Sequence, residues 1–544
     1  MKLQELAIAH LALCAAVLLW NLWAAGRAAQ LRYAPRFLAA ISGLGGLLVL
    51  PALAVHLLSG SLLTGRAFAS IAWIWPLTVA LVATQAIYAT TRGMLSPAIG
   101  IPIAVYDLLL ALIYAAAYLA DAGYLITDPL TVLVAAERGA IALSTLPAAL
   151  SLPWYLHVPI IAPCTALRRG ISGVLHIAVA AVALVWAGTI IAALPGASRA
   201  VQSYERFAAE RLRERPEQDF TIGIKIFPTV GAVVPSSSVQ RDLALADSIG
   251  TQALCIYISP RGTSASTLRS LAETLDGVRG ERQIVVALDL AHAIPRGIEA
   301  SGLPANRVAD VDALVSDAAR IARILRPDYL VPVVAPMTVG IESAALTPTL
   351  PSSPDRSHSA PGAGTDRGDT RGKGSSGDTD RALALWQRYI TAAAQAVHDA
   401  NRETRVMAHI GGLTTRDSAL YAWAASYSAP VDAVALTLFP GPSGATDISR
   451  AERTIDRWLT ARSDAPAKEH WILEAGGFPT VHGELSQSRA LWGILAWSTN
   501  HPVVRGVIAF EASDYSIRLG LQSPSGRIRL AAGTLKRAIA GLGE

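Results

Sequence analysis

The chain has 544 residues, of which 52% are hydrophobic and only 16% are charged, and its formal net charge is +5. Residues 1–197 hold only 14 of the Asp, Glu, Lys and Arg residues, so an apolar half precedes a charged half and a single soluble domain is excluded. The Arg residues are scattered without interleaved aromatic residues, which excludes nucleic acid as a partner.

The first half carries six apolar stretches of the length that crosses a lipid bilayer, which is about 20 residues for a helix. The first stretch has no clear cleavage site and further stretches follow it, so we expect an uncleaved first helix and not a signal peptide. We therefore expect a helical membrane domain over residues 1–197. Its spans are expected at about Leu6–Ala25, Phe37–Ser59, Ala67–Ala89, Ala98–Leu119, Ser144–Leu167 and Ile171–Leu194.

The distribution of arginine predicts the orientation, because cytoplasmic loops are enriched in Lys and Arg. Six spans that start outside return the chain to the outside, which predicts a multi-pass inner (plasma) membrane protein with a periplasmic or extracellular C-terminal half. The segment Leu125–Leu143 is either an interfacial helix or an extra crossing that would invert this orientation. Inward loops then carry Arg27, Arg32, Arg36, Arg92, Arg168 and Arg169, and outward loops carry Arg66 and Arg138.

Asp107 lies inside the fourth expected span, where an acidic side chain is costly and often functional. It would serve transport or sensing, or else pair with a neighbouring Ser or Tyr. The three cysteines, Cys14, Cys164 and Cys255, show no metal-ligand spacing. We therefore expect neither a metal ion nor a cofactor.

The second half alternates apolar runs with amphipathic segments, after a charged linker helix expected over residues 198–219. Strands rich in β-branched residues and separated by helices are typical of parallel βαβ units. Eight such units over residues 220–544 predict a (β/α)8, or TIM, barrel. The expected strands are Thr221–Phe227, Ala253–Ser259, Gln283–Leu290, Tyr329–Val334, Arg405–Ile410, Ala433–Phe439, Trp471–Leu473 and Val503–Phe510.

An insert interrupts this pattern after the fourth expected strand, over residues 347–379. It is rich in Pro, Gly, Ser and Asp and has almost nothing apolar to bury, so it is expected to be disordered. It would be a tolerated surface insertion or a lid over the barrel.

Carboxylates stand at the ends of the last two expected strands. The seventh reads WILEAGGFP and ends in Glu474, and the eighth reads VRGVIAFEASD and ends in Glu511. These motifs resemble glycoside hydrolase family 17 and its clan of retaining (β/α)8 glycosidases. The resemblance covers about Thr221 to the C-terminus. It implies that Glu474 is the catalytic nucleophile and that Glu511 and Asp514 line the sugar subsite.

The sequence departs from the clan at the fourth strand, where the clan carries its acid/base Glu, usually after Asn. Here Val334-Ala335 stands at that place. A retaining mechanism needs two carboxyl groups about 5–5.5 Å apart, and the lost acid forfeits a factor of about 10²–10⁴ in rate. Glu511 is the expected substitute acid, and Glu342 in the following loop is a less well placed one. Whether the barrel is an enzyme therefore stays open.

Other side chains at strand ends suit a sugar site. We expect Asp289 and His292 after the third strand and His409 on the fifth to contact substrate, although each would equally serve as a hydrogen-bonded support. Phe439-Pro440 after the sixth strand resembles the aromatic-Pro corner that the clan has near its subsites.

The leading hypothesis is a membrane-anchored barrel that binds, and as an enzyme remodels, a cell-envelope β-glucan or related polysaccharide. As an enzyme it would be a retaining glycoside hydrolase or transglycosidase. One alternative is an inactive glycan-binding subunit of polysaccharide synthesis or export. The other is a transporter or sensor with an accessory barrel. The expected partners are a polysaccharide or oligosaccharide and membrane lipid, and the sequence names no protein partner.

Overall fold

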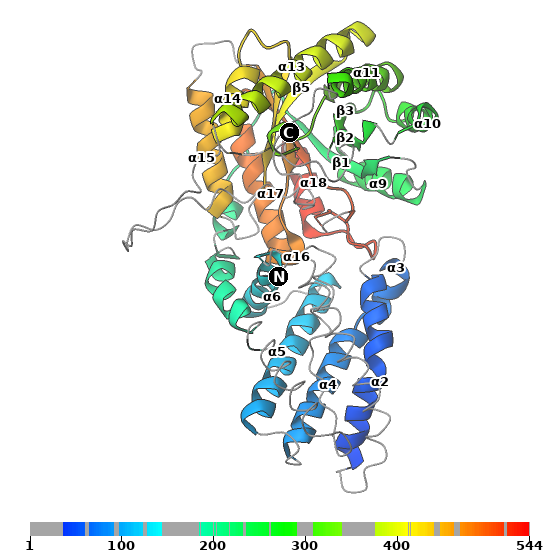
Figure 1. The fold of residues 1–544 in the computed structure, drawn as a ribbon, viewed down its shortest axis with the longest axis vertical. Coiled ribbons are helices and arrows are strands. Elements are labelled where there is room, and N and C mark those ends of the chain that lie inside the picture. Colours follow the sequence, from blue (N-terminus) through cyan, green and yellow to red (C-terminus); the bar gives the residue numbers. More distant parts are fainter. Residues whose placement is uncertain are drawn as a thin grey trace.

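The chain folds as a bundle of apolar helices followed by a closed barrel, and the two lie end to end (Figure 1). Apart from a few isolated positions, the computed structural model describes residues 36–59, 65–91, 97–122, 128–143, 187–199, 204–216, 218–231, 236–260, 263–290, 308–339, 376–411, 415–439, 446–461, 468–515 and 519–542.

The described part of the helical half contains helices at three of the expected spans. Two stretches in it, Ala69–Tyr88 and Gly100–Ala120, are long and apolar enough to cross a membrane. The expected spans Leu6–Ala25 and Ser144–Leu167 lie outside the described residues, as does most of Ile171–Leu194, so the count of six stays a prediction. The helices are α2 (Arg36–Ser59), α3 (Gly65–Phe68), the 3-10 helix η1 (Ala69–Ile71), α4 (Ile74–Thr91), α5 (Pro97–Asp121) and α6 (Asp128–Leu143).

Helix α6 takes up most of the segment whose status the sequence left open. Its described part has 16 residues, and the residues directly before and after it lie outside the described part of the chain. It packs against α5 on one side and against the barrel helix α16 (Pro479–His482) on the other. Helix α6 therefore lies at the junction of the two halves, and whether this segment crosses the membrane stays a prediction.

The predicted linker helix over residues 198–219 is only partly helical. The structure has a 3-10 helix η3 (Tyr204–Ala209), and residues 210–216 form no regular element. Those residues bond to the barrel helix α17 (Glu484–Thr499) and the turn after it, because Trp492 Nε1 donates to the Glu210 carbonyl and the Arg213 amide donates to Thr499 Oγ1. Bonds to this neighbour replace the intrahelical bonds that a linker helix would make.

The eight predicted strands are confirmed as a closed, all-parallel barrel in the order β1 to β8. Their ends differ from the expected ones by at most a few residues, which is the usual uncertainty at strand ends. The strands are β1 (Thr221–Val230), β2 (Ala253–Ile258), β3 (Gln283–Leu288), β4 (Tyr329–Val331), β5 (Arg405–Ile410), β6 (Ala433–Leu438), β7 (Glu469–Ala475) and β8 (Val504–Ala509).

Helices surround the barrel, as parallel strands require. Besides α16 and α17 they are α9 (Ser236–Ile249), α10 (Ala265–Asp276), α11 (Val308–Leu325), α12 (Pro336–Val339), α13 (Ser376–Ala400), α14 (Thr415–Ala424), α15 (Thr446–Thr460) and α18 (Leu530–Leu542). Most of the insert lies outside the described residues, and its last four residues, 376–379, belong to α13.

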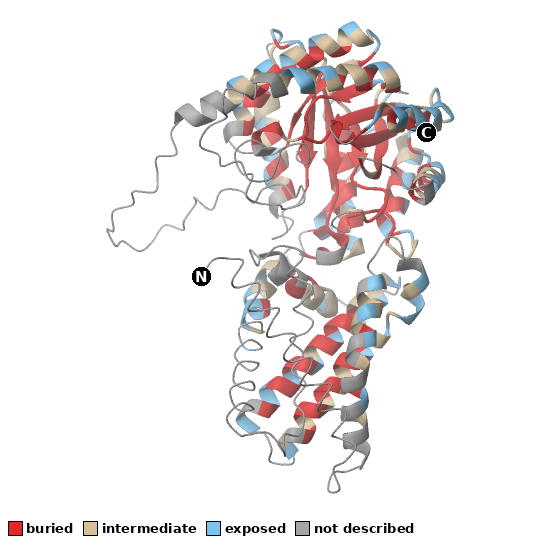
Figure 2. Cartoon of the chain, turned by 45° about the vertical axis from the view of Figure 1, so that its right-hand side comes forward, coloured by how far each residue is buried: buried red, intermediate tan, exposed pale blue. Residues whose placement is uncertain are grey.

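The barrel has two apolar layers, and its strands are buried along most of their length (Figure 2). Side chains that point outward, such as Ile256 and Leu436, pack against the helices, while Cys255, Met407 and Trp471 fill the interior. Trp471 needs a glycine beside it, because a Cβ on Gly506 would lie 2.3 Å from its ring. The interior is therefore a packed core, as is usual for this fold.

Candidate functional site

A layer of polar side chains replaces the apolar interior at the C-terminal ends of the strands. Alternate residues of a strand face the same side, so the inward positions after Cys255, Met407 and Ala435 are Tyr257, His409 and Thr437. The same alternation gives Lys225 on β1 and Asp289 after β3. All five residues are buried. In (β/α)8 barrels this end carries the active or binding site.

A β-bulge in β7 turns Glu474 into this layer. Leu436 pairs with Ile472, but Thr437 pairs with Glu474, so Leu473 is an extra residue in the strand. Simple alternation from the inward Trp471 would point Glu474 outward, toward the helices. Because the bulge adds one residue, Glu474 shares the inward side with Thr437.

Two hydroxyl groups hold the Glu474 carboxylate, which is 6% exposed. Tyr257 Oη donates to Oε1 at 2.7 Å and Thr437 Oγ1 donates to Oε2 at 2.7 Å. Both oxygens therefore accept a hydrogen bond from the layer itself. Burial, followed by the negative charge of Glu474, raises the pKa of the Tyr257 phenol well above its usual value, which keeps this donor protonated.

His409 supports the same carboxylate through Thr437. The Ala335 amide donates to His409 Nδ1 at 3.0 Å, so Nδ1 is the acceptor nitrogen, and His409 Nε2 donates to Thr437 Oγ1 at 3.0 Å. Burial lowers the pKa of His409 below its usual value, which favours this neutral form. The expected sugar ligand His409 is thus a positioning residue, one bond removed from Glu474.

Glu511 is held in a buried ion pair, which disfavours its expected role as substitute acid. Lys225 Nζ lies 2.8 Å from its Oε2, the Tyr515 amide donates to its Oε1 at 3.0 Å, and the carboxylate is fully buried. The lysine also lies 4.8 Å from the centre of the Phe510 ring. Both of its oxygens are therefore occupied by donors from the protein, whereas a general acid must present a proton to the leaving oxygen of the substrate.

The end of β4 provides no carboxylate among the residues that the structure describes. Ala335 occupies the position where the clan's acid is expected, with a positive φ of 47°, and a Cβ on Gly411 would lie 2.2 Å from its Cβ. Glu342, the other expected acid, lies outside the described residues. The backbone at Gly411, after β5, thus packs directly against Ala335, after β4, where the clan's acid is expected.

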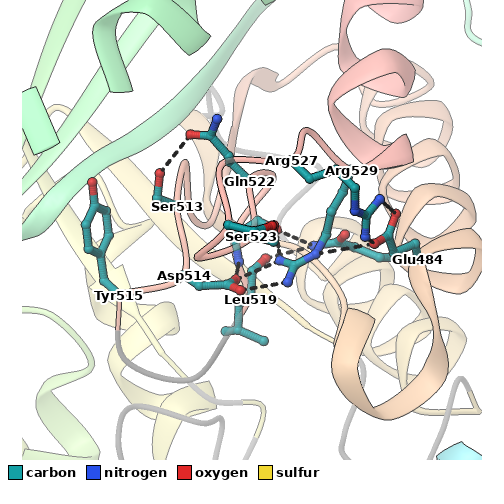
Figure 3. Close-up of polar contacts among 12 residues, drawn as sticks. Glu484, Ser513, Asp514, Tyr515, Leu519, Gln522, Ser523, Arg527 and Arg529 are labelled. Carbon is teal, nitrogen blue, oxygen red and sulfur yellow. Dashed lines mark hydrogen bonds and ion pairs between the residues drawn. The ribbon is translucent and has the colours of Figure 1, made fainter. Parts of the chain in front are cut away.

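Asp514 does not face the polar layer. Its two oxygens accept bonds from Arg529 at 2.7 and 2.6 Å, and its Oδ1 also accepts the Gly520 amide at 2.8 Å (Figure 3). Both side chains of this pair are buried. The predicted sugar-subsite residue therefore fastens the segment that follows β8.

The remaining expected ligands have separate outcomes. Asp289 lies close enough to Tyr257 that its charge contributes to the raised pKa of the phenol. Phe439 is buried against Phe478 and Phe510, with ring centres 5.7 and 6.2 Å away, and it packs mainly within this aromatic group. His292 lies outside the described residues.

Sequence reasoning missed Lys225, Tyr257 and Thr437. Each is the polar or hydroxyl-bearing residue at an inward position near the C-terminal end of an otherwise apolar strand, and that signal was available. No group of three His, Cys, Asp or Glu side chains suited to a metal ion occurs in the described ranges.

No protein-family model and no characterised protein sequence matches the chain. Solved structures with a similar fold include a β-glucuronidase from an uncultured Clostridium, with 12% identity, a TM-score of 0.40, and coverage of 59% of this chain and 50% of that one. A GH113 β-1,4-mannanase has 10% identity, a TM-score of 0.39, and coverage of 59% and 99%.

The virulence factor SghA from Agrobacterium tumefaciens has 13% identity, a TM-score of 0.39, and coverage of 63% and 100%. The chain spans about half the length of the β-glucuronidases that it matches. Similarity at this level does not indicate an activity for this chain. The closed barrel is established by the pairing of its eight strands.

Proposed function

We propose that this chain is a membrane-anchored protein whose barrel binds a cell-envelope glycan of the β-glucan type outside the cytoplasm. The observation that carries the proposal is the Glu474 carboxylate, held by two hydroxyl groups at the end of the barrel where this fold binds ligands. An oriented carboxylate accepts hydrogen bonds from sugar hydroxyls. The resemblance of the last two strands to glycoside hydrolase family 17 supports the choice of a β-glucan.

Binding without hydrolysis is the version that the site supports best. The Val334-Ala335 position carries no acid, and Glu511 is committed to Lys225. Without a proton donor for the leaving oxygen, a retaining mechanism forfeits its acid catalysis. The barrel would then present glycan to the machinery that synthesises or exports it.

One observation favours a second candidate, a retaining hydrolase with Asp289 as its acid. Both Asp289 and Glu474 lie close enough to Tyr257 to raise the pKa of its phenol. Asp289 is therefore a second carboxyl group of the polar layer near the phenol that binds Glu474.

Anchoring and orientation rest on the apolar helices and on the arginine distribution. The two stretches of spanning length and composition are Ala69–Tyr88, which runs from η1 into α4, and Gly100–Ala120 within α5. The C-terminal end of α5, which the arginine count assigns to the outside, is also the end that contacts the barrel. This agreement supports a barrel outside the cytoplasm.

The proposal is tested by titrating the full-length protein in detergent with linear β-glucan oligosaccharides, and with α-linked glucose oligomers as the control. We expect saturable binding of the β-linked series and, by chromatography, no shortening of the oligomers. The absence of any β-selective binding would overturn the proposal. Shortened products that disappear in Asp289→Asn would replace it by the hydrolase.

A further inference from the structure

The end of the barrel that carries Glu474 faces the helical half. Helix α16 follows β7 at this end and packs against α6 (Figure 1). A Cβ on Gly483 would lie 3.3 Å from Thr131 Cγ2 of α6, and Tyr204 Oη lies 3.3 Å from His482 Nδ1. The opposite end of the barrel, where the strands begin, points away from the helices.

An arginine fastens this end of the barrel to an apolar helix. Arg527, in the segment after β8, donates to the Ala120 carbonyl at 3.1 Å and to Glu484 Oε2 at 3.0 Å. Ala120 lies at the C-terminal end of α5, where a cation is favourable. The nearby Arg529 pairs with Asp514 (Figure 3). A hydrogen bond from an arginine that is itself ion-paired to Glu484 thus joins the rim of the barrel to the end of a candidate membrane span.

Exposed apolar side chains gather at the same place. Leu485, Ile528 and Leu530 are 44%, 52% and 48% exposed, and they flank Glu484, Arg527 and Arg529 in the chain. The fourth large apolar side chain exposed in the described part of the barrel, Tyr427, precedes β6 and so lies at the opposite end. Exposed apolar groups next to a span are suited to contact with the lipid surface.

The Glu474 carboxylate lies within a limited distance of the helical half. Gly483 is nine positions after Glu474 in the chain, and an extended chain spans at most about 3.5 Å per residue. Glu474 is therefore within about 30 Å of the helical half. A saccharide whose other end is embedded in the same bilayer can bridge that distance.

We propose that the ligand of the Glu474 site is a lipid-linked saccharide held in the same membrane. This inference rests on the proposed function and adds its substrate class. A glycan in bulk solution must enter beside the membrane, whereas a glycolipid headgroup rises from the bilayer directly into the facing end of the barrel.

The test uses the full-length protein in phosphatidylcholine vesicles, and its probe is a diacylglycerol carrying a short β-linked glucose oligomer with a fluorophore at its far end. Fluorescence anisotropy reports binding when probe and protein share vesicles and when they are in separate vesicles. The same oligomer without lipid is titrated in parallel. We expect at least tenfold tighter apparent binding in shared vesicles than in separate ones.

Equal binding in shared and separate vesicles would overturn the membrane-facing inference and leave the proposed function intact. Absence of binding to the shared probe and to the soluble oligomer would overturn the proposed function itself. Matched variants localise the effect. Leu485→Gln with Ile528→Gln should lower shared-vesicle binding several-fold and leave soluble-oligomer binding unchanged, while Tyr427→Gln at the opposite end should change neither. An unchanged shared-vesicle affinity in the double variant would contradict the role of this rim.

Discussion

Thr437 joins two residues that the sequence suggested only separately. Its hydroxyl donates to Glu474 and accepts from His409, whose other nitrogen accepts the Ala335 amide. These three hydrogen bonds form a row from the Ala335 amide to the Glu474 carboxylate. Each bond in this row has one direction only, because an amide can only donate and a carboxylate can only accept. The row sets the orientation of Glu474 before any sugar arrives.

Thr437→Val tests this row with a side chain of nearly the same shape. It leaves a Glu474 oxygen and the His409 Nε2 hydrogen without their partner, so we expect a loss of about 1–3 kcal/mol in unfolding free energy and weaker β-glucan binding. Chemical unfolding and the oligosaccharide titration measure the two effects. Thr454→Val on the exposed face of α15, where the hydroxyl bonds only to its own helix, is the control and should change neither.

Asp514→Asn tests the structural role of a residue that the sequence assigned to sugar binding. It removes the closer of the two carboxylates that pair with the buried Arg529 guanidinium and leaves only Glu484, at 3.7 Å, which costs up to about 3–5 kcal/mol. Protein that remains folded should bind glycan with unchanged affinity. Asp317→Asn breaks a more exposed pair with Arg320 and should cost less than about 1 kcal/mol. A glycan affinity that falls in Asp514→Asn while stability holds would restore the sugar-subsite role.

At the scale of elements, strand periodicity was enough to predict the barrel but not its site. Eight apolar runs separated by amphipathic segments specify eight parallel strands, and all eight were found. The bulge at Leu473 was not predictable, since nothing in WILEAGG marks the extra residue. Glu474 was placed correctly at the strand end, while its direction into the barrel depends on pairing with β6.

Glu511 and Asp514 lie in ion pairs that the sequence did not indicate, for a related reason. Their partners, Lys225 and Arg529, lie 286 residues before Glu511 and 15 residues after Asp514. From sequence alone, a carboxylate at a strand end is interpreted as a ligand, because the cation that pairs with it in the fold is not known. Lys225 was a recoverable signal, because a lysine in the otherwise apolar strand TIGIKIFPTV needs a buried counter-ion.

A buried histidine of strand β7, His470, should make the stability of the barrel depend on pH. His470 accepts a bond from Tyr421 and bonds to the Lys468 carbonyl, and burial lowers its pKa from 6.5 to about 4. In the unfolded chain His470 binds a proton below about pH 6.5, whereas in the folded chain it binds one only near pH 4. Unfolding free energy should fall by roughly 3 kcal/mol between pH 6.5 and pH 4 through this residue.

Denaturant unfolding followed by tryptophan fluorescence at several pH values measures this slope. His470→Gln removes the titrating group and should flatten the pH dependence over that window. His398→Gln, on the half-exposed pair with Asp432, is the matched control and should leave most of the dependence in place. A slope that is the same in His470→Gln and in the unaltered chain would contradict this assignment.

At the scale of the whole molecule, our proposal gives the helical half two roles: it locates the barrel outside the cytoplasm, and it faces the end of the barrel that carries the site. The arginine count predicts that the barrel lies outside, so a reporter that is active only in the periplasm should work when fused after Glu544. A reporter that is active only in the cytoplasm should be silent there. The reverse result would require an odd number of additional crossings, and the glycan would then be a cytoplasmic one.

We propose that the Glu474 end of the barrel is the glycan site. This proposal is tested most directly by a structure of the full-length protein determined with a saturating β-glucan oligosaccharide. The account predicts an intact sugar chain at the C-terminal ends of β6 and β7, with a hydroxyl group within hydrogen-bonding distance of the Glu474 carboxylate. A sugar bound at the opposite end of the barrel, or an unoccupied Glu474 layer at saturation, would contradict it.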